Sequence, residues 1–449
     1  MSSPQTPLGD WEQAANAPAA ELWRARHTLR ARLVAETRRR LRASWRQRGA
    51  SGAELTWIDD VLDPDVLTIG FARRVPSYKR LTLMLNDPER LSQLLNDPAT
   101  PLQVIVAGKA HPADVGGKAL IQQMVQFADS PDVRRRIVFL PDYDMAMAHA
   151  LVQGCDAWLN NPLRPLEACG TSGMKAALNG GLNISVRDGW WDEWYDGGNG
   201  WEIPSADGVE DPVRRDELEA LALYELLAKS VTPLFYDRDA EGVPLGWVDR
   251  IRHALLSLGP KVQAERMVRE YTSTLYVPAA DASRALAGAG GFQAARELAA
   301  WKKRVIDAWP GVRIEHVEAE AAGRRLGSAL AVRVAVTLGD LTSQDVTAEV
   351  VYGRPDDDDD IVQPGYVTLA AEPLPAGALP AGALPAGALP AGGANGIVRY
   401  SGEVTLDRPG PFGYTVRVLP HHPLLGSRAE LGLVTFPQAP AGMTNGDLR

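Results

Sequence analysis

The apolar residues of the chain follow two different patterns, and these divide it into two regions. From Val66 to about residue 186, short apolar runs such as VLTIGFA, LQVIVAG and RIVFLP alternate with segments of helical periodicity. Runs that are apolar throughout are typical of parallel strands buried on both faces, and their alternation with helices predicts an α/β fold with helices covering both faces of the sheet. Ligands of such sheets bind at the carboxyl ends of the strands.

Beyond about residue 310 the pattern changes to strict alternation of apolar and polar residues, as in ALAVRVAVTLG and FGYTVRVLP. This period of two, interrupted by turn signals, predicts a small antiparallel β domain with the architecture of a sandwich. The segment 374–393 repeats the sequence LPAGA. Because Pro and Gly sustain neither helix nor sheet pairing, we expect a disordered loop between two strands there.

The segment before the first strand is rich in arginine. Leu29, Leu33, Leu41 and Trp45 recur at helical spacing within it, which predicts an amphipathic helix. Its arginines could meet nucleic acid or membrane, but we favour a solvated helix face. The domain boundaries predicted from these patterns are 1–60 for an amino-terminal helical segment, 61–278 for the α/β lobe with its closing helices, 279–309 for a helical linker, 310–437 for the β-rich domain and 438–449 for a tail.

Composition narrows the classes of function. The net charge of −9 disfavours nucleic acid as a partner, and no apolar run approaches the roughly 20 residues of a membrane helix. The first twenty residues lack the layout of a secretory signal, so we expect a cytoplasmic protein. The two cysteines, Cys155 and Cys169, form no CxxC motif, and we expect both to be reduced and buried, with no structural metal. The aspartates at 356–360 repel one another, which favours a solvated loop over a cation site.

Two segments carry candidate chemistry. In GFARRVPSYKR a predicted strand ends in a group of cations, which are Arg73, Arg74, Lys79 and Arg80. Cations at the carboxyl end of a strand form a good anion site, although a basic loop paired with surface carboxylates such as Asp87 and Glu89 explains them equally well. In EACGTSGMK the residues 170–173 precede a predicted helix, whose free N–H groups would suit a phosphate. Lys175 would then hold a cofactor aldehyde as a Schiff base, while considered alone it is better explained as a surface lysine.

Together and in this order, RRVPSYKR and EACGTSGMK resemble two segments of the α-glucan phosphorylases, the pyridoxal-phosphate enzymes that release glucose 1-phosphate from glycogen or maltodextrin. GKAHP and VFLPDYD between them also resemble family segments. The stretch GTSGMKAALNGGLNISVRDGWWDEWYDGGNGW is similar to the shorter bacterial members, and the resemblance covers about residues 22–278. It implies a two-lobed glycosyltransferase (GT-B) fold, of which this chain contains one Rossmann-like lobe, the carboxyl-terminal one, followed by the small antiparallel β-rich domain.

The resemblance also implies roles for individual residues. Those expected at the pyridoxal phosphate are Lys175, Tyr143, Gly170, Thr171, Ser172, Gly173 and Arg73. The expected catalytic residues are Lys175 and the ligands of the substrate phosphate, Arg74 and Lys79. The expected glucose-binding residues are Glu167, Cys169 and Gly170. Arg73 stands where many family members have lysine. The tryptophans of DGWWDEWYDGGNGW could stack on sugars, but we interpret them as packing anchors.

The implied ligands are an α-1,4-glucan and inorganic phosphate. Only one Rossmann-like lobe can be drawn from the sequence, so we expect no turnover from this chain alone. A separately encoded amino-terminal lobe or a homo-oligomer are the candidate protein partners. Besides the catalytic half of a phosphorylase, three interpretations of the protein stay open. They are a truncated product without activity, a carbohydrate-binding fragment, and a nucleotide-sugar glycosyltransferase of the same fold. The lysine of GTSGMK weakens the last, because such a transferase has no use for it.

Overall fold

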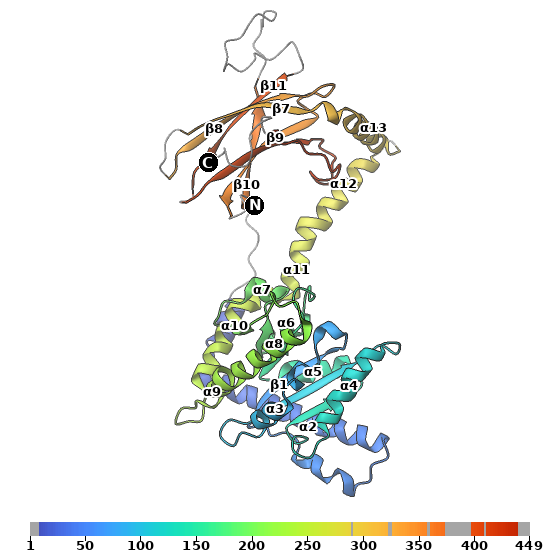
Figure 1. Cartoon of the computed structure of the whole chain (residues 1–449), viewed down its shortest axis with the longest axis vertical. Coiled ribbons are helices and arrows are strands. Elements are labelled where there is room, and N and C mark those ends of the chain that lie inside the picture. The colour runs from blue at the N-terminus through green and yellow to red at the C-terminus, as the bar shows by residue number, and fades with distance from the viewer. Residues whose placement is uncertain are drawn as a thin grey trace, which may run out of the picture. The chain divides into compact units, whose positions relative to one another are not determined.

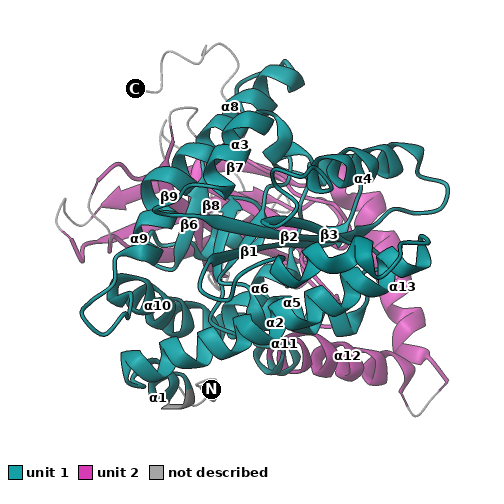
Figure 2. Cartoon of the chain, turned by 90° about the horizontal axis from the view of Figure 1, so that it is seen from below, with its two compact units in different colours: residues 1–269 teal, residues 270–449 magenta. Residues whose placement is uncertain are grey.

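The structure is a computed structural model that describes residues 9–288, 291–321, 326–356, 360–372, 397–407 and 410–438. The chain forms two compact units, Met1–Arg269 and Glu270–Arg449, which Figure 2 shows in different colours. The contacts thus divide the chain between residues 269 and 270, whereas the pattern of the sequence placed the end of the lobe at 278. Among the described helices, none is both long and apolar enough to cross a membrane.

The first unit is built on a parallel sheet. Its described strands are β1 (Leu67–Arg74), β2 (Leu102–Lys109), β3 (Ile137–Leu140), β4 (Ala157–Asn160), β5 (Leu182–Val186) and β6 (Gly200–Ile203). They pair in the order β3-β2-β1-β4-β5-β6, which is the order of doubly wound dinucleotide-binding sheets. The chain runs outward from β1 to β3 and then returns to place β4 on the other side of β1. The prediction of an α/β fold with a parallel sheet is confirmed.

Helices cover both faces of this sheet. The helices of this unit are α1 (Gly9–Ala15), α2 (Ala19–Gln47), α3 (Pro88–Leu95), α4 (Val115–Ala128), α5 (Met145–Gly154), α6 (Thr171–Leu178), α7 (Trp190–Trp194), α8 (Pro212–Leu226), α9 (Thr232–Tyr236) and α10 (Leu245–Val262). Helix α11 (Ala264–Tyr271) begins in this unit and ends in the second one. Helices α3, α4 and α8 lie on one face, and α2 and α5 lie on the other (Figure 2). Aspartate side chains cap the first turns of α3, α4, α5 and α8 by accepting backbone N–H groups, which fixes where these helices begin.

The arginine-rich helix α2 forms as predicted, but its arginines are not all solvated. Arg26 and Arg30 are buried, at 4% and 0% exposure. Arg30 Nη1 donates to Asp156 Oδ1 at 2.5 Å, and Arg26 donates to the carbonyl oxygens of Gln153 and Asn179. The expectation of a wholly solvated arginine face is therefore wrong at these positions, because α2 packs against α5 and brings Arg30 to Asp156, the residue before β4.

The second unit contains helices α12 (Val277–Ala287) and α13 (Gln293–Ala308) and an antiparallel sheet. Its described strands are β7 (Arg313–Ala321), β8 (Ala329–Thr337), β9 (Val346–Pro355), β10 (Ile361–Ala371), β11 (Ile397–Thr405) and β12 (Gly413–Pro420). They pair in the order β12-β9-β10-β11-β8-β7 (Figure 1). Among the described residues, strands β10 and β11 share two residue pairs, Ala370 with Ser401 and Ala371 with Tyr400.

This short junction decides the architecture of the β unit. Within the described residues, the halves β12-β9-β10 and β11-β8-β7 pair at this junction, and both contribute to one core that includes Val334, Val350, Val404 and Val416. Helix α13 adds Trp301 to the same core. The antiparallel β-rich region is confirmed, but the expected sandwich is a single sheet curled onto its own apolar face. The predicted loop 374–393 and the aspartates at 357–359 lie outside the described residues.

Candidate functional site

The candidate site lies where the strand order of the parallel sheet reverses. Strands β1 and β4 are neighbours, and the helical connections that follow them cover opposite faces of the sheet. Such a reversal opens a crevice at the carboxyl ends of the two strands, and this is where ligands of doubly wound sheets bind. Arg73 stands at this end of β1 and Asn160 at this end of β4.

Arg73 is the buried cation of the site. Its guanidinium Nη2 donates to Asn160 Oδ1, and the group lies 5.0 Å from the centre of the Phe71 ring. Nη1 lies 3.8 Å from Glu167 Oε2, yet among the described residues neither Nη1 nor Nε has a hydrogen-bond partner. Burial lowers the pKa of Arg73 to about 10, so the side chain stays charged at neutral pH. A charge that is 7% exposed and incompletely hydrogen-bonded favours binding of an anion.

Glu167 pairs with a second cation, Lys79, beside Arg73. Lys79 Nζ lies 3.0 Å from Glu167 Oε2, and Glu167 itself is only 5% exposed. The backbone N–H of Glu167 donates to Asp188 Oδ2 at 2.8 Å, which holds the loop after β4 against the turn after β5. Two cations therefore face one carboxylate, and the cluster of Arg73, Lys79 and Glu167 carries a net charge of about +1 at neutral pH.

The other two cations of the basic segment lie in different surroundings. Arg80 is 6% exposed, and its guanidinium donates to the Asn161 and Pro162 carbonyl oxygens and to carboxylates of Asp216 and Glu219. All three of its guanidinium nitrogens donate to α8 or to the loop after β4, so we interpret Arg80 as a residue that stabilises the fold. Arg74 is exposed, and no partner for its side chain occurs in the described part of the chain.

The carboxylates that pair with this segment are not the expected Asp87 and Glu89. Asp87 is the N-cap of α3 and accepts the backbone N–H of Arg90. Arg80 does pair with carboxylates, as the alternative reading expects, but with Asp216 and Glu219. The anion site at Arg73 and Lys79 stays a prediction. The predicted cluster of cations thus divides into two groups. Arg73 and Lys79 lie at the candidate site, and Arg80 holds the loop after β4 to α8.

Residues 170–173 begin α6, as the glycine pattern predicted. Gly170 is the N-cap, and its carbonyl oxygen accepts a hydrogen bond from Trp190 Nε1 at 3.1 Å. A Cβ atom on Gly173 would lie 2.4 Å from Asn183 Oδ1, so no larger residue fits there without displacing Asn183. The first N–H groups of a helix, here those of Thr171 and Ser172, have no acceptor within the helix.

The tryptophans after β5 are packing residues. Trp190 and Trp191 are 5% and 0% exposed, and Trp201 is 4% exposed. All three belong to the main core of the first unit. The interpretation of this stretch as packing anchors is confirmed, and Trp190 fixes the start of α6 through its hydrogen bond to Gly170.

Lys175 and Tyr143 lie on the borders of the site. Lys175 is in the last turn of α6 with an exposed side chain, and no described residue pairs with its amine. Burial raises the pKa of the half-buried Tyr143 hydroxyl, and the nearby charge of Arg73 partly offsets this shift. The structure thus brings Arg73, Lys79 and Glu167 into contact, with Tyr143 near Arg73, but it records no contact of Lys175 with any of them.

Of the two cysteines, only one is buried. Cys155 lies in the core, whereas Cys169 is exposed beside the site, so the expectation that both are buried is wrong. Partial burial and the charges of Glu167 and Glu193 raise the pKa of the Cys169 thiol. The thiol is therefore protonated at neutral pH.

Sequence reasoning missed the polar residues that support the site. Asn160 and Asn161 follow the buried strand β4, at 6% and 0% exposure, and Asn183 and Asp188 stand on and just after β5. Asn160 joins Arg73 to Ser185, because its Nδ2 donates to the Ser185 hydroxyl at 3.0 Å. Polar residues directly after apolar strands, as in AWLNNP, are the signal that could have identified them.

Comparisons with known proteins agree with this picture. The family model described as "Carbohydrate phosphorylase" matches residues 57–196, which include the whole candidate site, and the model described as "Glycogen phosphorylase C-terminal domain" matches 309–379 and 386–438. The glycogen phosphorylase of Mycobacterium tuberculosis (strain ATCC 25618 / H37Rv) is 56% identical over 428 residues, which are 95% of this chain and 47% of that protein. The chain belongs to the carbohydrate phosphorylase family.

More distant phosphorylases match over similar or shorter lengths. The maltodextrin phosphorylase of Thermococcus litoralis is 36% identical over 435 residues, 95% of this chain and 48% of that protein. The glycogen phosphorylase of Aquifex aeolicus is 44% identical over 266 residues, 59% of this chain and 38% of that protein. The chain spans about half the length of the curated relatives that it matches along most of its sequence. The predicted family resemblance is confirmed.

Proposed function

We propose that this chain supplies the cofactor and phosphate side of an α-glucan phosphorylase, which uses inorganic phosphate to cleave α-1,4-glucan into glucose 1-phosphate. The observation that carries this proposal is the buried guanidinium of Arg73, two of whose nitrogens have no hydrogen-bond partner among the described residues. It lies beside Lys79 and Glu167 at the reversal point of the sheet. We assign the first unit to one lobe of a GT-B fold on the same grounds.

The residues present fit pyridoxal phosphate. Arg73 needs an anionic partner, and the start of α6 provides N–H groups that favour a phosphate. Lys175, in the same helix, has an exposed amine that could bind an aldehyde covalently. Tyr143 would lie beside the cofactor, since its hydroxyl is close enough to Arg73 for their charges to interact.

The residues of this chain then have separate roles in phosphorolysis. Arg74 and Lys79 hold the attacking phosphate and stabilise the charge that it carries toward the sugar. Glu167 and the backbone at Cys169 and Gly170 accept and donate hydrogen bonds to glucose hydroxyls. When bound, the cofactor supplies a phosphate group that donates and accepts a proton beside the substrate phosphate. The glycosidic bond breaks through an oxocarbenium-like state, with retention at the anomeric carbon.

Turnover requires more than these residues. Positioning a sugar against two phosphates and excluding water need a closed site, and the residues described here form one side of it. We therefore expect no release of glucose 1-phosphate from maltodextrin by this chain alone, and activity when a second lobe completes the site. The second lobe is the proposed protein partner.

Covalent labelling of Lys175 tests the cofactor assignment without relying on activity. The chain is incubated with pyridoxal phosphate, reduced with borohydride and analysed by peptide mapping, and the label should fall on Lys175. Lys175→Ala should lose it, whereas Lys229→Ala, a change at a lysine that is 71% exposed, should keep it. Labelling that spreads over surface lysines, or that survives in Lys175→Ala, would contradict the proposal.

The phosphate ligands are tested in the two-lobe enzyme. Arg74→Ala and Lys79→Ala should each lower kcat/KM by about 100-fold to 1,000-fold, which corresponds to the loss of roughly 2.7–4 kcal/mol of transition-state stabilisation. Lys229→Ala again serves as the control. Turnover at the wild-type level in both variants would remove these residues from the mechanism.

A further inference from the structure

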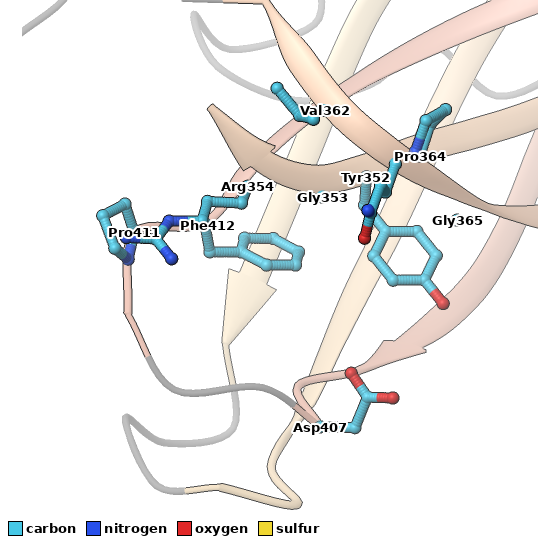
Figure 3. A pocket seen from close by; sticks show the side chains of 10 residues that line it. Tyr352, Gly353, Arg354, Val362, Pro364, Gly365, Asp407, Pro411 and Phe412 are labelled. Atoms are coloured by element: carbon cyan, nitrogen blue, oxygen red, sulfur yellow. The ribbon is translucent and has the colours of Figure 1, made fainter. Parts of the chain in front are cut away.

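The second unit contains a hollow of about 580 Å³ at one end of its curled sheet (Figure 3). Strands β9 and β10 and the segment before β12 form its walls. The residues that carry the argument are Tyr352, Arg354, Gln363, Asp407 and Phe412. A volume of this size is within the range of small-molecule binding sites, which is about 300–1,000 Å³.

Aromatic rings form a row along this end of the sheet. Tyr352 on β9 and Tyr414 on β12 are a directly opposed cross-strand pair, and Phe412 lies between their rings. The centre of the Phe412 ring is 6.0 Å from that of Tyr352 and 6.5 Å from that of Tyr414, with planes inclined by 32° and 29°. The three rings therefore form one aromatic cluster at this end of the sheet.

The aromatic rings continue the apolar face of the sheet beyond its buried part. Tyr352 and Tyr414 share their side of the sheet with the buried residues Val350 and Val416, because side chains alternate along each strand. Phe412 and Tyr414 are nevertheless 39% and 40% exposed. The apolar face thus continues beyond the part that the protein itself covers.

A bulge in β10 makes room beside the rings. The register of β10 against β9 shifts between Val362 and Gly365, and Gln363 has a left-handed φ of 50°. A Cβ atom on Gly365 would lie 2.5 Å from Cζ of Tyr352, so the ring of Tyr352 occupies the space that a side chain would fill. Bulges of this kind redirect side chains next to binding sites.

The polar residues around the hollow have free hydrogen-bonding capacity. Arg354, Gln363 and Asp407 are exposed, and in the described part of the chain none of these three side chains makes a hydrogen bond or an ion pair. Figure 3 shows Tyr352 and Phe412 along the hollow with Asp407 across from them. One positive and one negative charge nearly cancel, which suits a neutral ligand with many hydroxyl groups. Sugars have this character, because their C–H faces stack on aromatic rings while their hydroxyls bond to polar side chains.

We propose that this hollow binds an α-glucan chain at a site distinct from the one at the ends of β1 and β4. The choice of an α-glucan rests on the proposed function, whose substrate has this chemistry. The glucose units of such a chain offer C–H faces to the exposed rings of Phe412 and Tyr414 and hydroxyl groups to the polar side chains around the hollow. The hollow would hold the polymer to the protein and would contribute nothing to bond cleavage.

Maltoheptaose binding to the full 449-residue chain, followed by isothermal titration calorimetry, tests the proposal. Phe412→Ala should raise the Kd about tenfold, and the double variant Phe412→Ala/Tyr414→Ala should raise it further. Asp407→Asn, which removes only a charge at an exposed position, should also weaken binding. Phe436→Ala is the matched control, since Phe436 is 48% exposed and does not line the hollow. Circular dichroism should show the same melting curve for all variants.

The outcomes separate this proposal from the proposed function. If Phe412→Ala, its double variant and Asp407→Asn bind maltoheptaose as tightly as wild type, the hollow is not the site, whatever the result of labelling Lys175. Equal affinity for the β-1,4-linked cellohexaose would overturn the assignment to α-glucans. Loss of binding in Phe412→Ala with unchanged binding in Lys79→Ala would support a second site. That result would stand even if pyridoxal phosphate failed to label Lys175.

Discussion

The neighbourhoods of Arg73 and Arg80 show two uses of a buried arginine within one basic segment. Both side chains are almost fully buried, at 7% and 6% exposure. Arg80 donates to two carbonyl oxygens and two carboxylates. Arg73 donates to Asn160, and two of its nitrogens have no hydrogen-bond partner among the described residues. Burial of a guanidinium is costly in both cases, but only at Arg80 does the described protein itself offset the cost.

The difference separates what holds the fold from what binds a ligand. Arg80 ties the loop after β4 to α8, since Glu219 and Asp216 belong to that helix. Arg73 stands at the carboxyl end of β1, where ligands of doubly wound sheets bind. We propose that an anion takes up the hydrogen-bonding capacity that the described residues leave open. A buried cation is therefore informative about function only once its partners have been counted.

The largest expected effect is the loss of stability in Arg80→Ala. The substitution leaves Glu219 with Arg215 as its remaining cation and two carbonyl oxygens without their donor, so the free energy of unfolding should fall by about 3–5 kcal/mol. Urea unfolding followed by tryptophan fluorescence measures this, because ten of the 12 tryptophans precede residue 270. Arg214→Ala, at an arginine that is 59% exposed, should change stability by less than about 0.5 kcal/mol. A loss below about 1 kcal/mol in Arg80→Ala would remove the contrast with Arg73.

A smaller, pH-dependent effect is expected for Glu219→Gln. Burial alone would raise the pKa of Glu219, but hydrogen bonds from the Ala206 N–H and Arg215 and the charge of Arg80 outweigh it, so the pKa lies below its ordinary value of 4.5. A lowered pKa in the folded state stabilises the protein above pH 4.5, and this stabilisation is lost as the pH falls through the folded-state pKa. Glu219→Gln should thus cost about 2 kcal/mol at pH 7.

The pH profile is the diagnostic part of that measurement. The difference between wild type and Glu219→Gln should shrink as the pH falls below 4.5, since the unfolded chain then takes up a proton at Glu219 before the folded protein does, and it should be lost once the pH passes the lowered folded-state pKa. Glu217→Gln, on the exposed side of the same helix, should show no such change. A difference that stays constant down to acid pH would mean that the charge of Glu219 plays no part in holding α8.

The smallest expected effect on stability belongs to Arg73→Met. Replacing an incompletely bonded buried charge by an apolar side chain of similar length should change the free energy of unfolding by less than about 1 kcal/mol. Inorganic phosphate should raise the melting temperature of the wild type by binding the folded state, and this rise should disappear in Arg73→Met. Arg135→Met, at an exposed arginine, should retain it. A large loss of stability, or an undiminished phosphate effect, would place Arg73 with Arg80 as a structural residue.

The sequence identified the two fold regions and the segments that form the site. Apolar runs such as VLTIGFA predict buried parallel strands because burial on both faces is a property of each strand by itself. The glycines before α6 and the motif around Lys175 are equally local, and so the family could be recognised from the order of residues along the chain. The same reasoning found the alternating strands of the second unit.

The sequence analysis missed the partners that lie far away along the chain. The partner of Arg73 on β4 is 87 residues away, and that of Arg80 on α8 is 139 residues away, so the segment RRVPSYKR contains nothing that distinguishes the two arginines. The buried arginines of α2 were missed for the same reason, because Asp156 lies 126 residues beyond Arg30. The curled sheet of the second unit likewise depends on how few pairs join β10 and β11, which no local pattern encodes.

The family resemblance suggested the residues that we propose bind a phosphate and an aldehyde. What the sequence by itself determined was the identity and kind of the elements: parallel strands, antiparallel strands and the helix after GTSG. These follow from side-chain periodicity and from backbone preferences, which act over a few residues. Only the tertiary structure decided the strand order that places β4 beside β1, and with it the meeting of Arg73, Lys79 and Glu167. It also opened the hollow beside Tyr352 and Phe412, because a cavity exists only where distant segments fail to fill the space between them.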